Sequence, residues 1–245
     1  MTPPGPAPVI EIASLSKDYH SLRPLRIERL VVAERDCVAI LGLDQPMAET
    51  LVNLVTGATL PDRGNVSVFD RSTSLIDDST EWLRVVDRFG IVSGRAVLLD
   101  ALSVIQNLAI PFTLDIDPPP DEVRARAARL AVEAGISEAD CLRPVADLDE
   151  TGRLRTRLAR ALALDPGVLL LEHPSAGVPR HAVAPLASRV REIAARRGCA
   201  LLAATADEEF ADAVATRVLR LDPASGRLSE RRRRWPIVNV FRRRL

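Results

Sequence analysis

The order of apolar and polar positions along the chain predicts short strands that alternate with helices. Uninterrupted apolar runs occur at residues 37–41, 168–171 and 200–204. Runs of this length are typical of strands that are buried on both faces of a sheet. Residues 217–221 are expected to form a fourth strand. Since helical patterns separate these strands, the sequence favours a mostly parallel sheet with helices on both faces.

Apolar residues at helical spacing indicate the helices, and β-rich segments near the start indicate further strands. Helices are expected at residues 50–55, 81–89, 121–135, 153–164, 180–197 and 207–215. Strands are also expected at residues 9–12, 25–32 and 66–69. The segment 42–46 begins with glycine and ends with proline, so we interpret it as a turn that precedes the first helix.

The composition fits a globular protein. The chain of 245 residues is 47% hydrophobic and 27% charged, which suits one domain or two small lobes. No apolar run approaches the roughly 18 residues of a membrane span, and residues 1–8 lack the basic and apolar parts of a secretory signal. Cys37, Cys141 and Cys199 lie far apart without metal-ligand spacing. We therefore expect buried reduced thiols and a cytoplasmic location.

The charges are unevenly distributed, although basic and acidic side chains number 33 each. From Arg227 onward the sequence has eight arginines and one acid, Glu230, so the rest of the chain is acidic. Lys17 is the only lysine. Chemistry that needs an amine must use this residue, because arginine does not readily release its proton.

The segments Lys17–Tyr19, Gly42–Thr50, Leu158–Pro166 and Pro174–Gly177 are short motifs with a fixed order and spacing. In that order and spacing they resemble the ATP-binding subunits of ABC transporters across about residues 8–230. The most specific match is Leu158-Ala-Arg-Ala-Leu-Ala-Leu-Asp-Pro166, followed by the strand at 168–171 and by Pro174-Ser-Ala-Gly177. Lys17-Asp-Tyr19 is similar to the family's aromatic segment that stacks on adenine. The resemblance implies an α/β fold of the P-loop NTPase type. It would have a mostly parallel sheet, an antiparallel β subdomain and a helical subdomain at about residues 95–160.

The phosphate loop departs strongly from the family pattern. The family sequence G-x-x-G-x-G-K-S/T-T aligns with Gly42-Leu-Asp-Gln-Pro-Met-Ala-Glu-Thr50. In the family, backbone N–H groups close around the phosphates, the lysine reaches the β/γ oxygens and the hydroxyl holds magnesium. Here Ala48 stands at the lysine position and Glu49 at the hydroxyl position. Asp44 adds a second carboxylate, so the loop is expected to repel a polyphosphate.

Other positions that matter in the family differ as well. Gly94 stands at the glutamine-loop position, Ala206 at the switch-histidine position, and Leu148-Asp-Glu-Thr-Gly152 at the signature sequence. Glu172 stands where the family orients magnesium, and His173 where it has its general-base glutamate. A histidine is able to act as a base. Phosphoryl transfer also needs positioned charges, however, so we expect a structural role for His173 and assign no catalytic residue.

Tyr19, Gly42, Thr50 and Glu172 are the candidate residues for residual nucleotide binding. Tyr19 is either an adenine platform or an exposed aromatic at a strand end. Glu172 is either a metal ligand or a buried carboxylate at the edge of the sheet; we favour the carboxylate and assign no metal ligand. Lys17 is expected on a distant strand, which disfavours it as a relocated phosphate lysine. ATP is expected to bind weakly, if at all, and magnesium is not expected.

The resemblance and the departures together predict a degenerate subunit, a pseudo-ATPase, of an ABC transport complex. It would pair with a second ATPase subunit, as a heterodimer or a homodimer, and with a membrane permease. Its place would be cytoplasmic, peripheral at the inner face of the membrane. The alternatives are a non-transport scaffold or binding protein that reuses the fold, and an ATPase that binds ATP weakly.

Residues 231–245 are expected to form a separate basic and aromatic tail. Arg231–Arg234 and Arg242–Arg244 flank the segment Trp235–Phe241. This pattern suits an anionic membrane surface. It also suits an acidic partner, including a second copy of the chain, or a solvated tail. Nucleic acid is not expected as a partner, because the rest of the sequence does not indicate a base-stacking platform.

Overall fold

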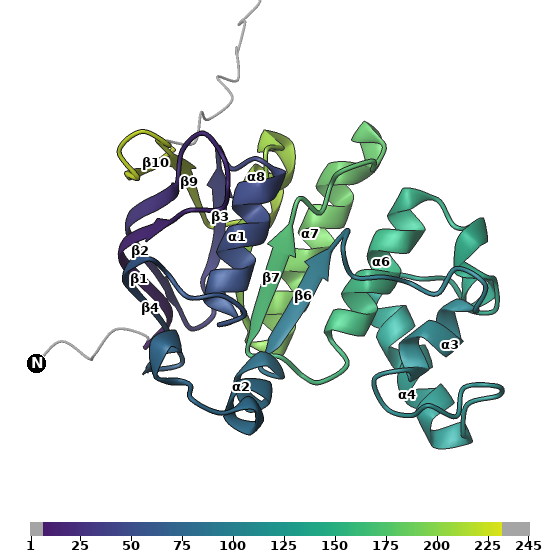
Figure 1. The fold of residues 1–245 in the computed structure, drawn as a ribbon. Helices are drawn as coiled ribbons and strands as arrows, with labels where there is room; N and C mark the ends of the chain where they lie inside the picture. The colour runs from purple at the N-terminus through teal and green to yellow at the C-terminus, as the bar shows by residue number, and fades with distance from the viewer. Residues whose placement is uncertain (1–6, 232–245) are drawn as a thin grey trace, which may run out of the picture.

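Two sheets form the scaffold of the computed structural model, which describes residues 7–231 (Figure 1). The six-stranded sheet has the order β10-β9-β3-β8-β7-β6, and its neighbours are parallel except for β10 and β9. Its strands are β3 (Cys37–Leu41), β6 (Phe89–Ser93), β7 (Val168–Glu172), β8 (Ala200–Ala204), β9 (Arg217–Leu221) and β10 (Leu228–Glu230). The antiparallel sheet, ordered β2-β1-β4-β5, consists of β1 (Pro8–Lys17), β2 (Leu25–Ala33), β4 (Arg63–Val68) and β5 (Arg71–Ser72).

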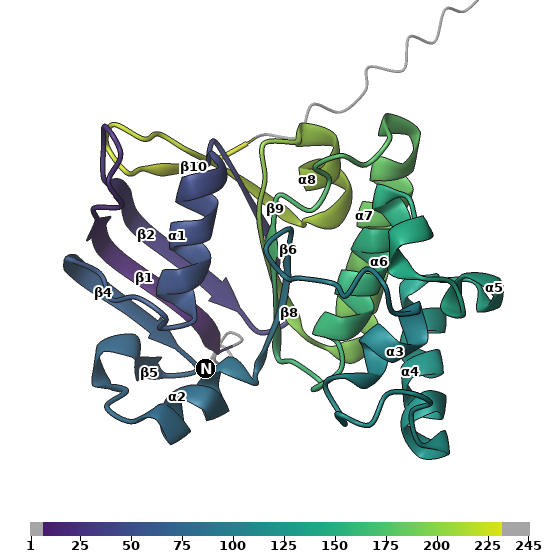
Figure 2. The same ribbon diagram turned by 45° about the vertical axis from the view of Figure 1, so that its right-hand side comes forward.

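Helices cover both faces of the six-stranded sheet (Figures 1 and 2). The α-helices are α1 (Gln45–Val55), α2 (Ser79–Val86), α3 (Val104–Ala109), α4 (Asp121–Ala134), α5 (Glu138–Cys141), α6 (Glu150–Ala161), α7 (Arg180–Arg197) and α8 (Glu208–Val214). Two single turns of 3₁₀-helix are η1 (Thr73–Leu75) and η2 (Val145–Asp147). Helices α3 to α6 form a helical lobe beside α7 (Figure 2). Within residues 7–231, no helix combines the length and the apolar character that crossing a membrane requires.

Strand β3 shows why the apolar runs in the sequence are uninterrupted. Cys37, Ala39 and Leu41 belong to the apolar cluster that includes α7, α8 and the helical lobe. Val38 and Ile40 belong to a second cluster, which includes α1 and the antiparallel sheet. Every residue of a central strand is then buried, whichever face it points to. The strands expected at residues 37–41 and 217–221 are confirmed, and all three cysteines are buried and reduced, as expected.

The sequence pattern does not reveal the edge strand β6. It predicts a helix over residues 81–89, but this is wrong at its end, because α2 ends at Val86 and β6 begins at Phe89. Gly90 interrupts the apolar run of this strand and weakens its signal. The glycine lets the end of α6 approach the strand, since a Cβ atom there would lie 2.6 Å from the carbonyl oxygen of Ala161.

Candidate functional site

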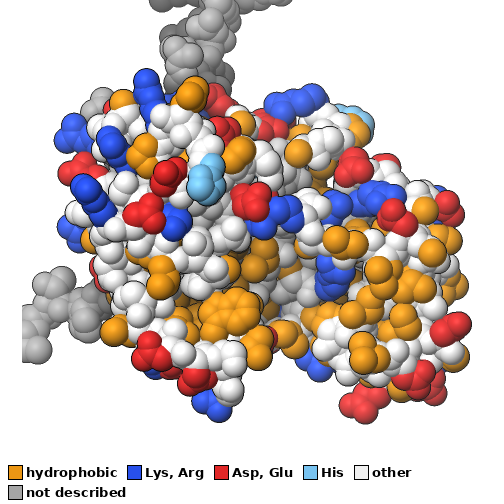
Figure 3. Space-filling model, in the orientation of Figure 1, with side chains coloured by type: hydrophobic (Ala, Val, Ile, Leu, Met, Phe, Trp, Pro, Cys, Tyr) orange, Lys and Arg blue, Asp and Glu red, His pale blue; other side chains and the backbone are white. Residues whose placement is uncertain are grey.

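The candidate site lies at the carboxyl ends of β3, β6 and β7, where α1 begins. Ligands of parallel α/β sheets bind at this edge, because the loops that follow the strands meet there. Figure 3 shows the same face as a space-filling view, with a hollow between the sheets and the helical lobe. Acidic and basic side chains lie side by side where these two parts meet (Figure 3).

Helix α1 begins earlier than the sequence predicts. It starts at Gln45 rather than near Thr50, so only three residues separate it from the end of β3. Asp44 caps the helix: its carboxylate accepts a hydrogen bond from the Met47 N–H at 2.8 Å, and its carbonyl accepts one from the Ala48 N–H at 2.9 Å. Pro46 fits the first turn of a helix, where no N–H partner is needed. The interpretation of residues 42–46 as a turn is therefore wrong from Gln45 onward.

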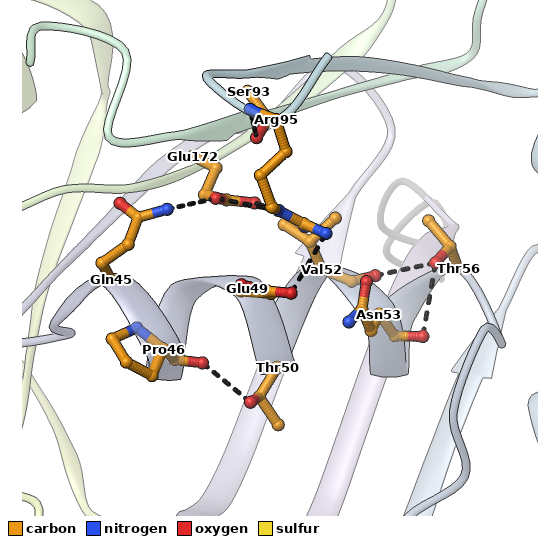
Figure 4. Close-up of polar contacts among 10 residues, drawn as sticks. All are labelled: Gln45, Pro46, Glu49, Thr50, Val52, Asn53, Thr56, Ser93, Arg95 and Glu172. Atoms are coloured by element: carbon orange, nitrogen blue, oxygen red, sulfur yellow. Dashed lines mark hydrogen bonds and ion pairs between the residues drawn. The ribbon is translucent and has the colours of Figure 1, made fainter. Parts of the chain in front are cut away.

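The remaining phosphate-loop residues are engaged within the protein. Gly42 has a φ of +93°, and a Cβ atom there would lie 3.0 Å from the carbonyl oxygen of Leu221, so it serves the turn beside β9. Ala48 is fully buried in the second apolar cluster. The Thr50 hydroxyl donates to the carbonyl of Pro46 at 2.7 Å, on the side of α1 opposite to Glu49 (Figure 4).

Four side chains, which we call the Arg95 cluster, meet above the first turns of α1: Gln45, Glu49, Arg95 and Glu172 (Figure 4). Glu172 ends β7, and its side chain is fully buried. It accepts hydrogen bonds from Gln45 Nε2 at 2.5 Å, from Arg95 Nη2 at 2.7 Å and from Arg95 Nε at 3.2 Å. Arg95 Nη1 lies 3.3 Å from a carboxylate oxygen of Glu49. The guanidinium thus joins two carboxylates from different elements.

The electrostatics of this cluster keep Arg95 charged. Its pKa is raised above the ordinary value of arginine, first by the hydrogen bonds to Glu172 and then by the negative charges of Glu172 and Glu49, against the opposing effect of burial. A buried carboxylate is costly unless a cation or hydrogen-bond donors satisfy it. Arg95 and Gln45 together supply those donors to Glu172, which is buried as predicted, and its assignment as something other than a metal ligand stays a prediction.

Lys17 and Tyr19 make no hydrogen bond or ion pair with the Arg95 cluster. The Lys17 ammonium lies 2.9 Å from Asp62, at the end of β1. The pKa of Asp62 is lowered, first by the hydrogen bond from the Asp18 N–H and then by Lys17. Tyr19 is half-buried against the second apolar cluster, and its hydroxyl is buried. Its interpretation as an exposed aromatic is therefore wrong, while its role as an adenine platform stays a prediction.

His173 follows Glu172 and lies between two cavities. One, of about 530 Å³, is also lined by Ser175, Arg180 and residues 205–209, which include Ala206. The other, of about 120 Å³, is also lined by Ser93, Glu150 and Arg157, among others. The backbone of His173 has a φ of +42°, and its N–H donates to the carbonyl of Ala204 at 2.8 Å. This turn carries the chain from β7 over the end of β8.

The segment at the signature position also begins with a capped helix. Asp149 caps α6 by accepting a hydrogen bond from the Gly152 N–H at 2.7 Å, in the same way that Asp44 caps α1. Glu150, in the first turn, packs against the turn at Gly177, where a Cβ atom would lie 3.2 Å from its Cγ. The amino-terminal ends of α1 and α6 therefore each carry a carboxylate of the chain itself.

Comparison with known proteins finds relatives among the ATP-binding proteins of transport systems. The sequence is 28% identical over 240 residues to the methionine import ATP-binding protein MetN of Brucella abortus, covering 98% of this chain and 63% of MetN. It is 29% identical over 209 residues to the lipoprotein-releasing system ATP-binding protein LolD of Alcanivorax borkumensis, covering 83% of this chain and 90% of LolD. The chain is similar to ATP-binding proteins of ABC transporters over most of its length. No family model matches the chain.

Solved structures show the same fold as this chain. A dimeric ATP-binding cassette, bound to ADP and Pi in a post-hydrolysis state, superposes with a TM-score of 0.74 at 20% identity, covering 91% of this chain and 98% of the cassette. The cbiO1 protein of Clostridium perfringens, part of the ABC transporter complex cbiONQ, gives a TM-score of 0.75 at 21% identity, covering 91% and 87%. The chain spans only 63% of the length of MetN.

Sequence reasoning missed two residues of the site. Gln45 belongs to a segment interpreted as a turn, and Arg95 follows a strand that the pattern does not reveal. The signal for Arg95 is a cation two residues after the end of β6, at the edge where Glu172 also ends β7. This signal can be recognised only once β6 is known to be a strand parallel to β7.

Proposed function

We propose that this chain is the ATP-binding-type subunit of an ABC transport complex, and that its own nucleotide site does not hydrolyse ATP. It would work beside a second, competent ATPase subunit and a membrane permease. The observation that supports this most is the Arg95 cluster. In it, an arginine of the chain donates hydrogen bonds to the carboxylate of Glu172 at the end of β7. The rest of the site is consistent with it.

The residues at this site do not fit a magnesium–triphosphate group in their present arrangement. Binding of the phosphates uses free backbone N–H groups, a lysine and a hydroxyl. Here the Met47 and Ala48 N–H groups bond to Asp44, Ala48 replaces the lysine, and the Thr50 hydroxyl bonds to its own helix. Glu172 would have to leave Arg95 before it could contact a metal ion.

Charge adds to this mismatch. Asp44 places a carboxylate at the cap of α1 and Glu49 places another in its second turn, near the end of the helix whose backbone dipoles would otherwise attract an anion. Residual nucleotide binding would depend on Tyr19, Gly42, Thr50 and Glu172, and we propose that it is weak and independent of magnesium. No residue of the chain is proposed as catalytic.

The relatives support the choice of complex. Their names describe methionine import and lipoprotein release, and one structural neighbour is part of an ABC transporter complex. Another neighbour is dimeric. We infer that this chain works at the inner, cytoplasmic face of a membrane, in a heterodimer or a homodimer. Contact of the basic tail with an anionic surface stays a prediction, since residues 232–245 lie outside the described residues.

ATP turnover by the purified chain tests the proposal. We expect no magnesium-dependent release of phosphate above the rate of a protein-free blank. His173→Ala is the informative variant, and His181→Ala, which alters an exposed histidine on α7, is its matched control. Turnover by the wild-type chain that His173→Ala abolishes and His181→Ala preserves would contradict the proposal and support a slow ATPase with His173 as its base.

A further inference from the structure

The segment from Gly94 to Asp100, which we call the strap, is the first of two connections between the six-stranded sheet and the helical lobe. It leaves β6 and runs across to α3 (Figure 2). The second connection runs from the end of α6 to β7. The strap is thus one of the parts that set the position of the lobe relative to the sheet, beside the apolar cluster that joins the lobe to α7.

At its sheet end, the strap is held by Arg95. The guanidinium donates to the buried carboxylate of Glu172 and pairs with Glu49, so that it contacts both β7 and α1. The Arg95 N–H also donates to the hydroxyl of Ser93 at 3.0 Å, which fixes the turn that leaves β6.

At its lobe end, the strap is held by α6. Arg160 Nη1 donates to the carbonyl of Val97 at 2.7 Å, and Arg153 Nη1 lies 2.9 Å from the carboxylate of Asp100. Burial lowers the pKa of Arg160, and the positive charge of Arg157 lowers it further. The carbonyl of Val97 is a partner that this arginine needs, because a half-buried cation without an acceptor would be poorly solvated.

A buried amide fastens the strap to α3. Asn107 is fully buried, its Oδ1 accepts from the Leu99 N–H at 2.8 Å, and its Nδ2 donates to the Leu99 carbonyl at 3.0 Å. The same Nδ2 reaches the carbonyls of Leu102 and Ser103 at 3.3 and 3.0 Å. Both polar groups of the side chain therefore form hydrogen bonds with backbone groups at the end of the strap and at the start of α3.

We propose that the strap locks the helical lobe to α1 and β7 without any ligand, and that Arg95 is the positioning residue that closes this lock. An unbroken series of contacts then leads from α1 through Arg95, Val97 and Asp100 to α6. Each contact is made by a side chain or a backbone group of the chain itself. The lobe and the sheet form one rigid body whether or not a nucleotide is present.

The consequence for transport rests on the proposed function. A subunit whose lobe is locked transmits the motion of a competent partner as a rigid body, and it does not open and close by itself. Failure of the proposed function would appear as magnesium-dependent ATP binding by the wild-type chain. Failure of the lock would appear in the dynamics of the strap with no nucleotide added, so the two failures are distinguishable.

Hydrogen exchange measured by mass spectrometry tests the lock on the full chain. Arg95→Gln removes the charge that joins Glu172 and Glu49. Arg180→Gln is the matched control: it removes an arginine that also pairs with two carboxylates, Asp207 and Glu209, but outside the strap. We expect exchange in Arg95→Gln to rise most in peptides of the strap, α3 and α6, about tenfold more than in α7. Addition of magnesium and ATP to the wild-type chain should leave the exchange of the lobe unchanged.

Two results would overturn the lock. One is unchanged exchange of the strap in Arg95→Gln, and the other is an equal rise in all elements, which would show only a general loss of stability. If Arg95→Gln does not fold, Glu49→Gln and Arg160→Gln provide the test, since they weaken the sheet end and the lobe end separately. Each should raise exchange in the strap above the wild-type level, and exchange equal to wild type in both would reject the proposal.

Discussion

Two cation–carboxylate contacts of this chain differ in what surrounds them. Lys17 pairs with Asp62 at the end of β1, and the Asp62 side chain is 47% exposed. Arg95 pairs with Glu172, whose side chain is fully buried. In the first contact water can replace either partner, whereas in the second the loss of the cation leaves a buried charge.

The comparison shows which cation of the protein pairs with a buried carboxylate. The only lysine forms a surface contact between a strand and a turn, and the phosphate-loop position of the family's lysine is apolar and buried, at Ala48. The positive charge at the edge of the sheet comes instead from Arg95. An arginine suits this position because its planar guanidinium group can contact two carboxylates at once.

The largest effect is expected for Arg95→Ala. This substitution leaves Glu172 buried with Gln45 as its remaining partner, and we expect the free energy of unfolding to fall by about 3 kcal/mol. Chemical denaturation at neutral pH measures it. The double variant Arg95→Ala/Glu172→Gln should recover part of the loss, because the charge is then removed as well. A loss no larger than that of Lys17→Met would show that burial does not distinguish the two contacts.

A smaller effect is expected for Asp44→Ala, next to the Arg95 cluster. Loss of the cap frees the Met47 N–H and should lower the free energy of unfolding by about 1 kcal/mol. Asp44→Asn is the matched control, since asparagine caps helices equally well without the charge. Equal losses in both variants would mean that the charge of Asp44 matters and its cap does not.

A third contact, between Arg197 and Glu133, lies between the two in burial. Arg197 donates to Glu133 at 2.9 and 2.6 Å, and their side chains are 18% and 21% exposed. The pKa of Glu133 is lowered, first by these hydrogen bonds and then by the charge of Arg197. The contact therefore stabilises the fold above the pKa of an unfolded glutamate, about 4.3, and this stabilisation disappears as the pH falls through the lowered value.

The variant Arg197→Gln tests this pH dependence. It should lower the free energy of unfolding at pH 7 by about 1 kcal/mol, with the difference from wild type shrinking toward pH 3. Denaturation curves at a series of pH values measure the difference. A difference that stays constant or grows as the pH falls would contradict the assignment of the lowered pKa to Arg197.

The smallest effect is expected for Lys17→Met. Because the contact with Asp62 is exposed to water, its loss should leave the free energy of unfolding close to that of the wild type. Added salt should reduce even this difference, since salt screens exposed charges. A change as large as that of Arg95→Ala would mean that Lys17 has a role in the fold which its exposed contact does not explain.

The interior of the fold could be predicted from the sequence, whereas the site could be predicted only in part. The apolar runs at residues 37–41, 168–171 and 200–204 predict the strands β3, β7 and β8, because strands in the middle of a sheet are apolar on both faces. Strand β6 could not be predicted in this way, because Gly90 and its position at the edge of the sheet weaken the apolar pattern. Proline and glycine near residues 42–46 suggested a turn, although Asp44 and Pro46 start a helix equally well.

Glu172 and Arg95 illustrate the remaining limit. The burial of Glu172 follows from its position at the end of an apolar run. Its partner is 77 residues away in the sequence, at the end of a strand without a strong signal. A contact of this kind depends on the order of strands in the sheet, which local patterns do not specify. The exposure of Tyr19 was predicted wrongly for a related reason, since its burial depends on packing against the second apolar cluster, which local patterns do not specify.

The most direct test of the closed site is a calorimetric titration of the full wild-type chain with ATP in the presence and absence of magnesium. A micromolar dissociation constant corresponds to a binding free energy of about −8 kcal/mol, which this site cannot supply while Arg95 holds Glu172 and Asp44 caps α1. We predict no binding in the micromolar range and no dependence on magnesium. Micromolar binding that requires magnesium would contradict the account.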